Sequence, residues 1–181
     1  MRSRLLRILA VSAALVPAGA ALPATSAQAS RAACASGSTH PAQAASRRVQ
    51  LTTLCLINRE RSRHGLRALR LDPRLSAASL GHSRNMVSRG YFEHGNFVAR
   101  IMNAHYVRPG SAWSLAENIA WGTGYLATPA QIVRGWMNSS GHRANILNGR
   151  FRDIGVGIAL GAPTRGASGG ATYTTDFGRK G

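Results

Sequence analysis

The sequence predicts an α+β domain built from helices and a small antiparallel sheet. Segments with apolar residues at helical spacing come first, and segments with strand-like alternation are concentrated in residues 154–177. The sequence contains no internal repeats. Helices that are segregated from a small antiparallel sheet typically form a layered domain around one hydrophobic core.

The first expected helix covers about residues 46–64. Leu51, Leu54 and Ile57 recur on one face at helical spacing, and Gly65 is the stop signal. The opposite face carries arginines, as is typical of a helix with one side in water.

The next two helices begin with the same signal, an N-cap residue followed by proline. This signal occurs at residues 72–73 and again at residues 128–129. Gly90 ends the second helix, and residues 138–141 end the third. The expected buried stripe of the third helix consists of Ile132, Val133, Trp136 and Met137.

Strand character follows these helices. Apolar residues alternate with small ones over residues 154–160, which is the period of a half-buried strand. A turn-rich connection over residues 161–170 leads to a second strand over residues 171–177, and the two are expected to pair as an antiparallel hairpin. A third strand is expected over residues 114–121, and it carries Glu117.

The N-terminus has the composition of a signal peptide over residues 1–29. Three arginines precede an apolar run over residues 8–21, and a small-x-small cleavage site follows at residues 27–29. The run is too short for a comfortable membrane span, although an uncleaved anchor is the alternative. We therefore expect a secreted protein without a transmembrane anchor, in which residues 30–45 form a flexible linker before one domain over residues 46–181.

The chain is strongly basic, with 23 Lys and Arg residues against six Asp and Glu residues. Residues 1–29 contain three of the arginines and no acid, so their removal leaves a formal charge of +14. A protein with this charge is attracted to polyanions, so anionic envelope polymers or lipids are the expected partners. The basic residues lack the interleaved aromatic residues and the recognition helix of a protein that binds specific nucleic-acid sequences. We also expect the protein to be a monomer.

Two cysteines, Cys34 and Cys55, remain after cleavage. An even number in an exported chain favours one disulfide, and two free thiols are the alternative. A disulfide between them would close a loop of about 20 residues and contribute about 3 kcal/mol in the chain-entropy model.

Three residues stand out chemically: His94, Glu117 and His142. Imidazole and carboxylate groups are ligands of divalent metals, and they also exchange protons near neutral pH. Zinc accepts two imidazoles and one carboxylate and keeps a fourth position for water. The three residues are scattered in the sequence, without the helical spacing that identifies a metalloprotease.

Several segments together resemble bacterial domains of the CAP superfamily (SCP-like domains), which includes cysteine-rich secretory proteins, insect venom allergens and plant pathogenesis-related proteins. The resemblance covers about residues 50–178, and the motifs occur in the family's order. They are LINRERSRHGL at 56–66, YFEH at 91–94, ENIA at 117–120, WMNSSGHRANIL at 136–147, GVG at 155–157 and DFG at 176–178.

The resemblance implies a three-layer α–β–α sandwich with a cleft over the sheet. In the family, two histidines and two glutamates line this cleft, and in some members they hold a divalent ion. His94, Glu117 and His142 match three of these positions. The remaining glutamate normally follows the first histidine by a few residues, but residues 95–99 contain no carboxylate. Bacterial members often lack it, so the departure weakens tight binding of zinc or another divalent cation rather than the fold.

Without a metal, Glu117 and a histidine would serve as a general base, but the sequence offers no persuasive nucleophile. Ser139 and Ser140 lie near His142 in sequence, yet serines before a glycine are more typical of a helix end. The alternative to a functional site is a hydrogen-bonded polar network that joins loops to the sheet.

The remaining candidates have simpler interpretations. His82 falls on the apolar stripe of the second helix and is expected to be a core histidine, whereas His105 could line the cleft. Asn58 and Arg61 are expected to brace the first helix. The tryptophans are expected in the core, although one at the cleft rim could bind an apolar ligand; they are Trp113, Trp121 and Trp136.

These observations lead to two main hypotheses. The first is an exported CAP-domain protein that acts as a binding or interaction module at or outside the cell envelope. The second is a metal-dependent hydrolase in which His94 and His142 are ligands and Glu117 is a third ligand or the base. A cationic antimicrobial protein is a third possibility that rests on charge alone.

Overall fold

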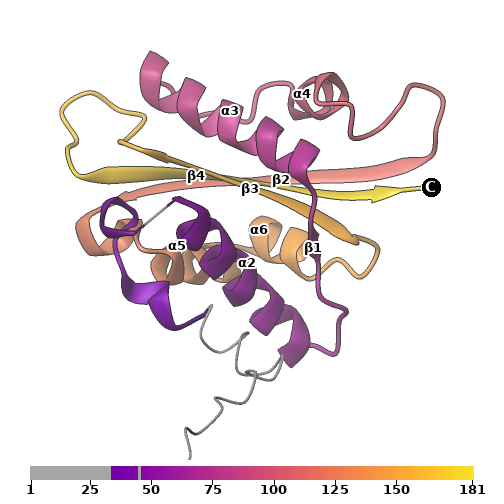
Figure 1. Cartoon of the computed structure of the whole chain (residues 1–181), viewed down its shortest axis with the longest axis horizontal. Helices are drawn as coiled ribbons and strands as arrows, with labels where there is room; N and C mark the ends of the chain where they lie inside the picture. Colours follow the sequence, from indigo (N-terminus) through magenta and orange to yellow (C-terminus); the bar gives the residue numbers. More distant parts are fainter. Residues whose placement is uncertain (1–33, 45) are drawn as a thin grey trace, which may run out of the picture.

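Figure 1 shows the computed structural model, which describes residues 34–44 and 46–181. The chain forms three layers, as the resemblance implied. A sheet lies in the middle, with α3 and α4 on one side and α2, α5 and α6 on the other. The expected signal peptide lies outside the described residues. The helices are α2 (Ser46–Arg63), α3 (Pro73–Arg89), α4 (Phe97–Asn103), α5 (Pro129–Met137) and α6 (Ser140–Ile146).

The sheet has four strands in the order β1-β3-β4-β2. The expected hairpin is present, because β3 (Asp153–Leu160) pairs antiparallel with β4 (Gly170–Lys180). β2 (Trp113–Thr123) pairs antiparallel with the other side of β4 and forms one edge. At the opposite edge, the two-residue strand β1 (Arg70–Leu71) runs parallel to β3. The sheet is therefore mixed, rather than purely antiparallel as we expected it to be.

Local signals explain where the helices begin. The carboxylate of Asp72 caps α3 by accepting from the backbone N–H groups of Arg74 and Leu75 at 2.8 and 3.2 Å, and Gly90 ends the helix in the left-handed conformation. The short helices α4 and α6 were not predicted. Each has seven residues and one buried side chain, Ile101 or Ile146, so neither shows a helical repeat of apolar residues.

Two hydrophobic clusters cover the two faces of the sheet. The larger cluster joins α2, α5 and α6 to β3 and β4, and the indole N–H of its Trp136 donates to the backbone oxygen of Ile119 at 3.1 Å. The smaller cluster lies beneath α3 and α4 and consists of Leu75, Ala78, Ile101, Tyr106 and Val107.

Helix α3 approaches the sheet closely because β3 presents Gly155 and Gly157 to it. A Cβ atom on Gly157 would lie 2.1 Å from the backbone nitrogen of Leu80. The close approach lets the hydroxyl of Ser83 donate to the backbone oxygen of Gly157 at 3.0 Å. In the same way, the hydroxyl of Ser79 donates to the carboxyl of Asp176 at 2.7 Å. Glycines that alternate in the strand therefore set the distance between two layers.

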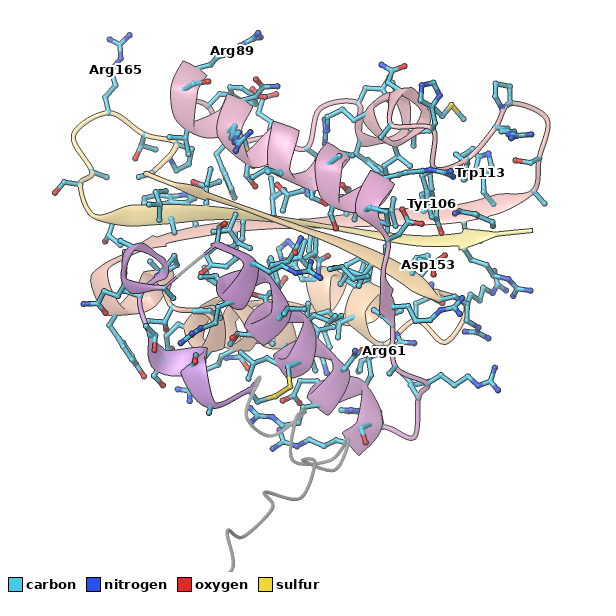
Figure 2. The ribbon with its side chains drawn as sticks, in the orientation of Figure 1. Arg61, Arg89, Tyr106, Trp113, Asp153 and Arg165 are labelled. Carbon is cyan, nitrogen blue, oxygen red and sulfur yellow. A yellow bond between two sulfur atoms is a disulfide. The ribbon has the colours of Figure 1, made fainter. Side chains whose placement is uncertain are left out.

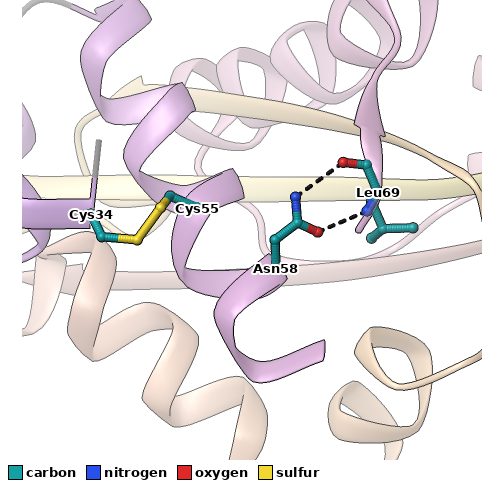
Figure 3. Close-up of a disulfide and its surroundings, with 4 residues drawn as sticks. All are labelled: Cys34, Cys55, Asn58 and Leu69. Atoms are coloured by element: carbon teal, nitrogen blue, oxygen red, sulfur yellow. Dashed lines mark hydrogen bonds between the residues drawn. A yellow bond between two sulfur atoms is a disulfide. The ribbon is translucent and has the colours of Figure 1, made fainter. Parts of the chain in front are cut away.

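Residues 34–44 differ from the flexible linker that we expected. They contain two short 3₁₀ helices, Ser36–Ser38 and Pro41–Gln43, and a disulfide joins Cys34 to Cys55 of α2 (Figure 3). The ring of His40 also hydrogen-bonds to the backbone oxygen of Gly169 at 3.0 Å. Composition alone suggested a linker, but the disulfide and these contacts hold the segment against the domain.

Two polar residues of α2 brace the helix, as expected. Asn58 exchanges two hydrogen bonds with the backbone of Leu69, at 2.8 and 3.0 Å (Figure 3). Arg61 is fully buried, and its guanidinium donates to the backbone oxygens of Arg67, Ile146 and Asn148 at 2.7 to 3.0 Å (Figure 2). Burial, together with the charge of Arg152, lowers the pKa of Arg61.

Candidate functional site

The candidate site lies at the edge of the sheet formed by β2. Successive side chains of a strand point to opposite faces, so Glu117 and Asn118 face different layers. Glu117 contacts residues from the α3–α4 side, and Asn118 contacts α6. Since β2 has no strand on its outer side, groups from both layers meet around its edge.

Glu117 is the buried centre of a charged network. Nδ1 of His94 donates to Oε1 of Glu117 at 2.7 Å, and the guanidinium of Arg100 donates to Oε2 at 2.5 Å. The side chain of Glu117 is 1% exposed, whereas that of His94 is 49% exposed. Arg100 therefore balances the buried negative charge, and His94 presents the network to solvent.

Asp176 lies directly behind this network on β4. It is the register partner of Glu117, so the two side chains occupy the same face of neighbouring strands. Asp176 is buried, and its Oδ2 accepts the hydrogen bond from Ser79. Its Oδ1 has no hydrogen-bond partner among the described residues. A proton on Oδ1 would let Asp176 donate to the carboxylate of Glu117, whereas two ionised carboxylates cannot hydrogen-bond to each other.

The surroundings favour the protonated form of Asp176. Burial first, and then the charge of Glu117, raise the pKa of Asp176 well above its usual range; Ser79 and Arg100 oppose this shift. The folded chain therefore keeps the Asp176 proton at pH values where the unfolded chain has released it. Between the unfolded and folded pKa values the folded state binds more protons, so this residue makes folding less favourable as the pH rises.

His82 holds the loop that carries His94. It is buried in α3, as expected for a core histidine, and its Nε2 donates to the backbone oxygen of Glu93 at 2.9 Å. Burial first, then the charge of Arg100, lower the pKa of His82, which favours the neutral ring. The structure thus gives His82 a positioning role that its place on an apolar stripe did not indicate.

His142 lies on the other side of the β2 edge, in the first turn of α6. Its Nδ1 is 2.9 Å from the hydroxyl of Ser139, and its backbone oxygen accepts from Asn118 at 3.1 Å. Asn145 reinforces this attachment by donating to the side-chain oxygen of Asn118 at 2.9 Å. Burial and the nearby His94 lower the pKa of His142, so its neutral form is favoured.

A groove adjoins His142 along β2 and α5. It has a volume of about 430 Å³ and is lined by apolar side chains, with Ser139, His142 and Gln131 as the polar groups. Two of its side chains remain strongly accessible to solvent: Phe92 is 40% exposed and Leu126 is 62% exposed. Trp121 and Trp136 also line the groove, and Trp136 is otherwise buried in the core.

The side chains as arranged do not form a three-ligand metal site. Both oxygens of Glu117 are engaged, one by His94 and one by Arg100, and Nδ1 of His142 faces Ser139. Among the described residues, no group of three or more His, Cys, Asp or Glu side chains has the geometry to hold a metal ion. Zinc bound through Oε1 of Glu117 would have to replace the hydrogen bond from Nδ1 of His94.

The structure therefore joins His94 directly to Glu117 and places His142 near them, attached to a different layer. Sequence reasoning missed Arg100 and Asp176. The usable signal for Asp176 was its position in the DFG segment at 176–178, which lies in a strand expected to pair with others. His105 remains outside this network; it has a positive φ of 58°, and its backbone oxygen accepts from Arg74.

Comparison with known proteins places this chain in a family. The profile of CAP, the cysteine-rich secretory protein family, matches residues 54–175. The chain therefore belongs to the CAP family. Within the described residues, no helix combines the length and apolar character needed to cross a membrane.

Two curated relatives come from Bacillus subtilis (strain 168). The uncharacterized protein YkwD is 40% identical over 103 residues, which is 56% of this chain and 39% of YkwD. The uncharacterized membrane protein YlbC is 36% identical over 110 residues, which is 58% of this chain and 30% of YlbC. The chain thus spans well under half the length of the curated relatives it matches.

Solved structures share the fold. An extracellular protein containing a SCP domain from Bacillus anthracis str. Ames has a TM-score of 0.60 at 30% identity, over 72% of this chain and 40% of that one. A cysteine-rich secretory protein from Staphylococcus aureus has a TM-score of 0.55 at 16% identity, over 72% of this chain and 38% of that one. The second likeness concerns the fold alone.

Proposed function

We propose that this CAP-family protein is an exported binding module that acts at or outside the cell envelope, with its ligand site in the groove beside His142. The observation that carries the proposal is the groove itself, where large apolar side chains stay accessible beside the polar groups of Gln131, Ser139 and His142. Apolar walls with a few placed polar groups are typical of ligand sites.

The ionic network that adjoins His142 is held in place as well. Arg100 and His94 keep Glu117 in one geometry, and His82 fixes the backbone beside His94. Since Nδ1 of His94 is committed to Glu117, Nε2 is the nitrogen left for a ligand. A rigid site loses less conformational freedom when a ligand binds, which favours affinity.

Export is supported by the composition of residues 1–29 and by the family. The disulfide between Cys34 and Cys55 suits an oxidising compartment. The formal charge of +14 that remains after cleavage favours retention on anionic envelope material.

Retention of the purified protein on isolated envelope material at graded salt tests the proposal, with Leu126→Ala and Leu160→Ala as a matched pair. Both leucines are strongly exposed, at 62% and 57%, but only Leu126 lines the groove. We expect Leu126→Ala to weaken the retention that persists at high salt, and Leu160→Ala to match the parent. Equal retention of both variants, or no retention of the parent at low salt, would contradict the proposal.

The alternative from the sequence, a metal-dependent hydrolase, has a separate test. Zinc titration by calorimetry, together with hydrolase screening of a His94→Ala/His142→Ala variant, separates the two functions. Zinc binding with turnover that the variant loses would support the hydrolase. Equal turnover by variant and parent would exclude these histidines from catalysis.

A further inference from the structure

A second concave surface lies where the ends of β1, β3 and β4 meet. It has a volume of about 480 Å³ and shares no lining residue with the groove at the β2 edge. Figure 2 shows Tyr106, Trp113 and Asp153 near this end of the molecule. We name this surface the basic hollow; it is lined by Arg70, Asp72, Arg152, Asp153, Arg179 and Lys180.

The two carboxylates of the basic hollow already have structural partners. Oδ1 of Asp72 caps α3, and its Oδ2 lies 3.3 Å from the ammonium of Lys180. Oδ2 of Asp153 accepts from the hydroxyl of Tyr106 at 2.9 Å, and its Oδ1 lies 3.8 Å from Arg70. The carboxylates therefore hold the walls of the hollow together.

The cations of the basic hollow outnumber its carboxylates. Arg152 donates to the backbone oxygens of Gly149 and Phe151, and neither Arg152 nor Arg179 has an ion-pair partner among the described residues. Arg70 makes a long contact with Asp153, but its side chain is 81% exposed. Positive charge is thus available in a concave surface, which concentrates its attraction for anions.

The wall of the basic hollow is fixed rather than loose. The ring of Tyr106 lies against Gly178, where a Cβ atom would come within 2.4 Å of the ring. The ammonium of Lys180 lies 4.2 Å from the centroid of the same ring, and the Tyr106 hydroxyl is held by Asp153. The ring attracts the cation, which favours this position of the Lys180 ammonium.

The strength of these charges indicates what kind of ligand fits. One exposed ion pair contributes little, so the basic hollow would hold a single small anion weakly. A flexible polyanion gains from several contacts at once and from release of its counterions. We propose that the basic hollow binds the oxyanion groups of an anionic envelope polymer; this inference rests on the proposed function and assigns its polyanion contact to a surface separate from the groove.

The test compares two double variants with the same change in charge. Arg70→Gln/Arg179→Gln removes two exposed arginines from the basic hollow. Arg89→Gln/Arg165→Gln removes two exposed arginines at the opposite end of the molecule (Figure 2). Binding is measured over a range of salt concentrations with poly(glycerol phosphate) as the phosphate source and polygalacturonate as the carboxylate source, and with duplex DNA. Circular dichroism checks that each variant is folded.

We expect Arg70→Gln/Arg179→Gln to weaken binding of at least one polymer and to reduce the salt slope of log K by about 1 to 2, since each lost phosphate contact removes about 1. The Arg89→Gln/Arg165→Gln variant should keep the slope of the parent. Equal losses in the two variants would refute the basic hollow while leaving the proposed function intact. Failure of the parent to bind any envelope polymer would refute both. A preference for duplex DNA that only the Arg70→Gln/Arg179→Gln variant loses would overturn the assigned partner.

Discussion

Replacing Gly157 by alanine tests how closely α3 packs on the sheet. An added Cβ atom would lie 2.1 Å from the backbone nitrogen of Leu80, which is 1.3 Å short of the 3.4 Å where ordinary contact begins. Backbone atoms cannot rotate away as a side chain does, so α3 must shift by a comparable distance. The shift would lengthen the hydrogen bonds of Ser79 and Ser83 to β4 and β3, now 2.7 and 3.0 Å.

The expected cost combines two effects. Overpacking a core costs about 1–3 kcal/mol, and two lost side-chain hydrogen bonds add about 1 kcal/mol each. We therefore expect Gly157→Ala to lower the free energy of unfolding by about 3–5 kcal/mol. Urea unfolding followed by far-UV circular dichroism measures this change. A lower urea concentration at the midpoint, with an unchanged m-value, reports a loss of stability.

A glycine in α3, the helix that packs on Gly157, provides the control. Gly81 is exposed in α3, and a Cβ atom there would contact nothing within 4 Å. Gly81→Ala should raise stability by about 0.5–1 kcal/mol, because alanine is the better helix former. The free energies of unfolding of Gly157→Ala and the parent could instead agree within about 0.5 kcal/mol, which is less than the smallest overpacking cost. The close approach of α3 to β3 would then be wrong.

Three further predictions concern other buried interactions, and each is measured by urea unfolding. Asp176→Asn should become increasingly more stable than the parent as the pH rises above about 4, the usual carboxyl pKa, because asparagine mimics the protonated acid that the folded chain retains. A difference that does not change with pH would contradict this. Changing both Cys34 and Cys55 to serine should cost about 3 kcal/mol, and a loss below about 1 kcal/mol would show that the segment over residues 34–44 adds little constraint. Arg61→Met should cost about 3 kcal/mol or more, because three backbone oxygens lose their donor; a variant as stable as the parent would mean that water replaces the guanidinium.

The site shows where prediction from sequence reached its limit. His94, Glu117 and His142 were selected by their chemistry and by the motifs around them, and the structure joins the first two directly. Arg100 was not selected, since one arginine among many carries no signal that it will meet a buried carboxylate. Asp176 was missed because its contact with Glu117 depends on the register of β2 against β4, which local composition does not specify.

The sequence by itself determined the parts of the fold that depend on neighbouring residues. Capping residues and proline placed the starts of α3 and α5, and period-2 alternation placed the β3–β4 hairpin. These signals act over a few residues, so they are visible without a structure.

Only the tertiary structure decided which distant groups share one environment. It buried Arg61 against the backbone oxygens of distant loops, and it placed Asp176 behind Glu117. It also gathered Arg70 and Arg179, which are far apart in the sequence, around the basic hollow. Burial and charge depend on packing between layers, and the order of residues along the chain does not specify that packing.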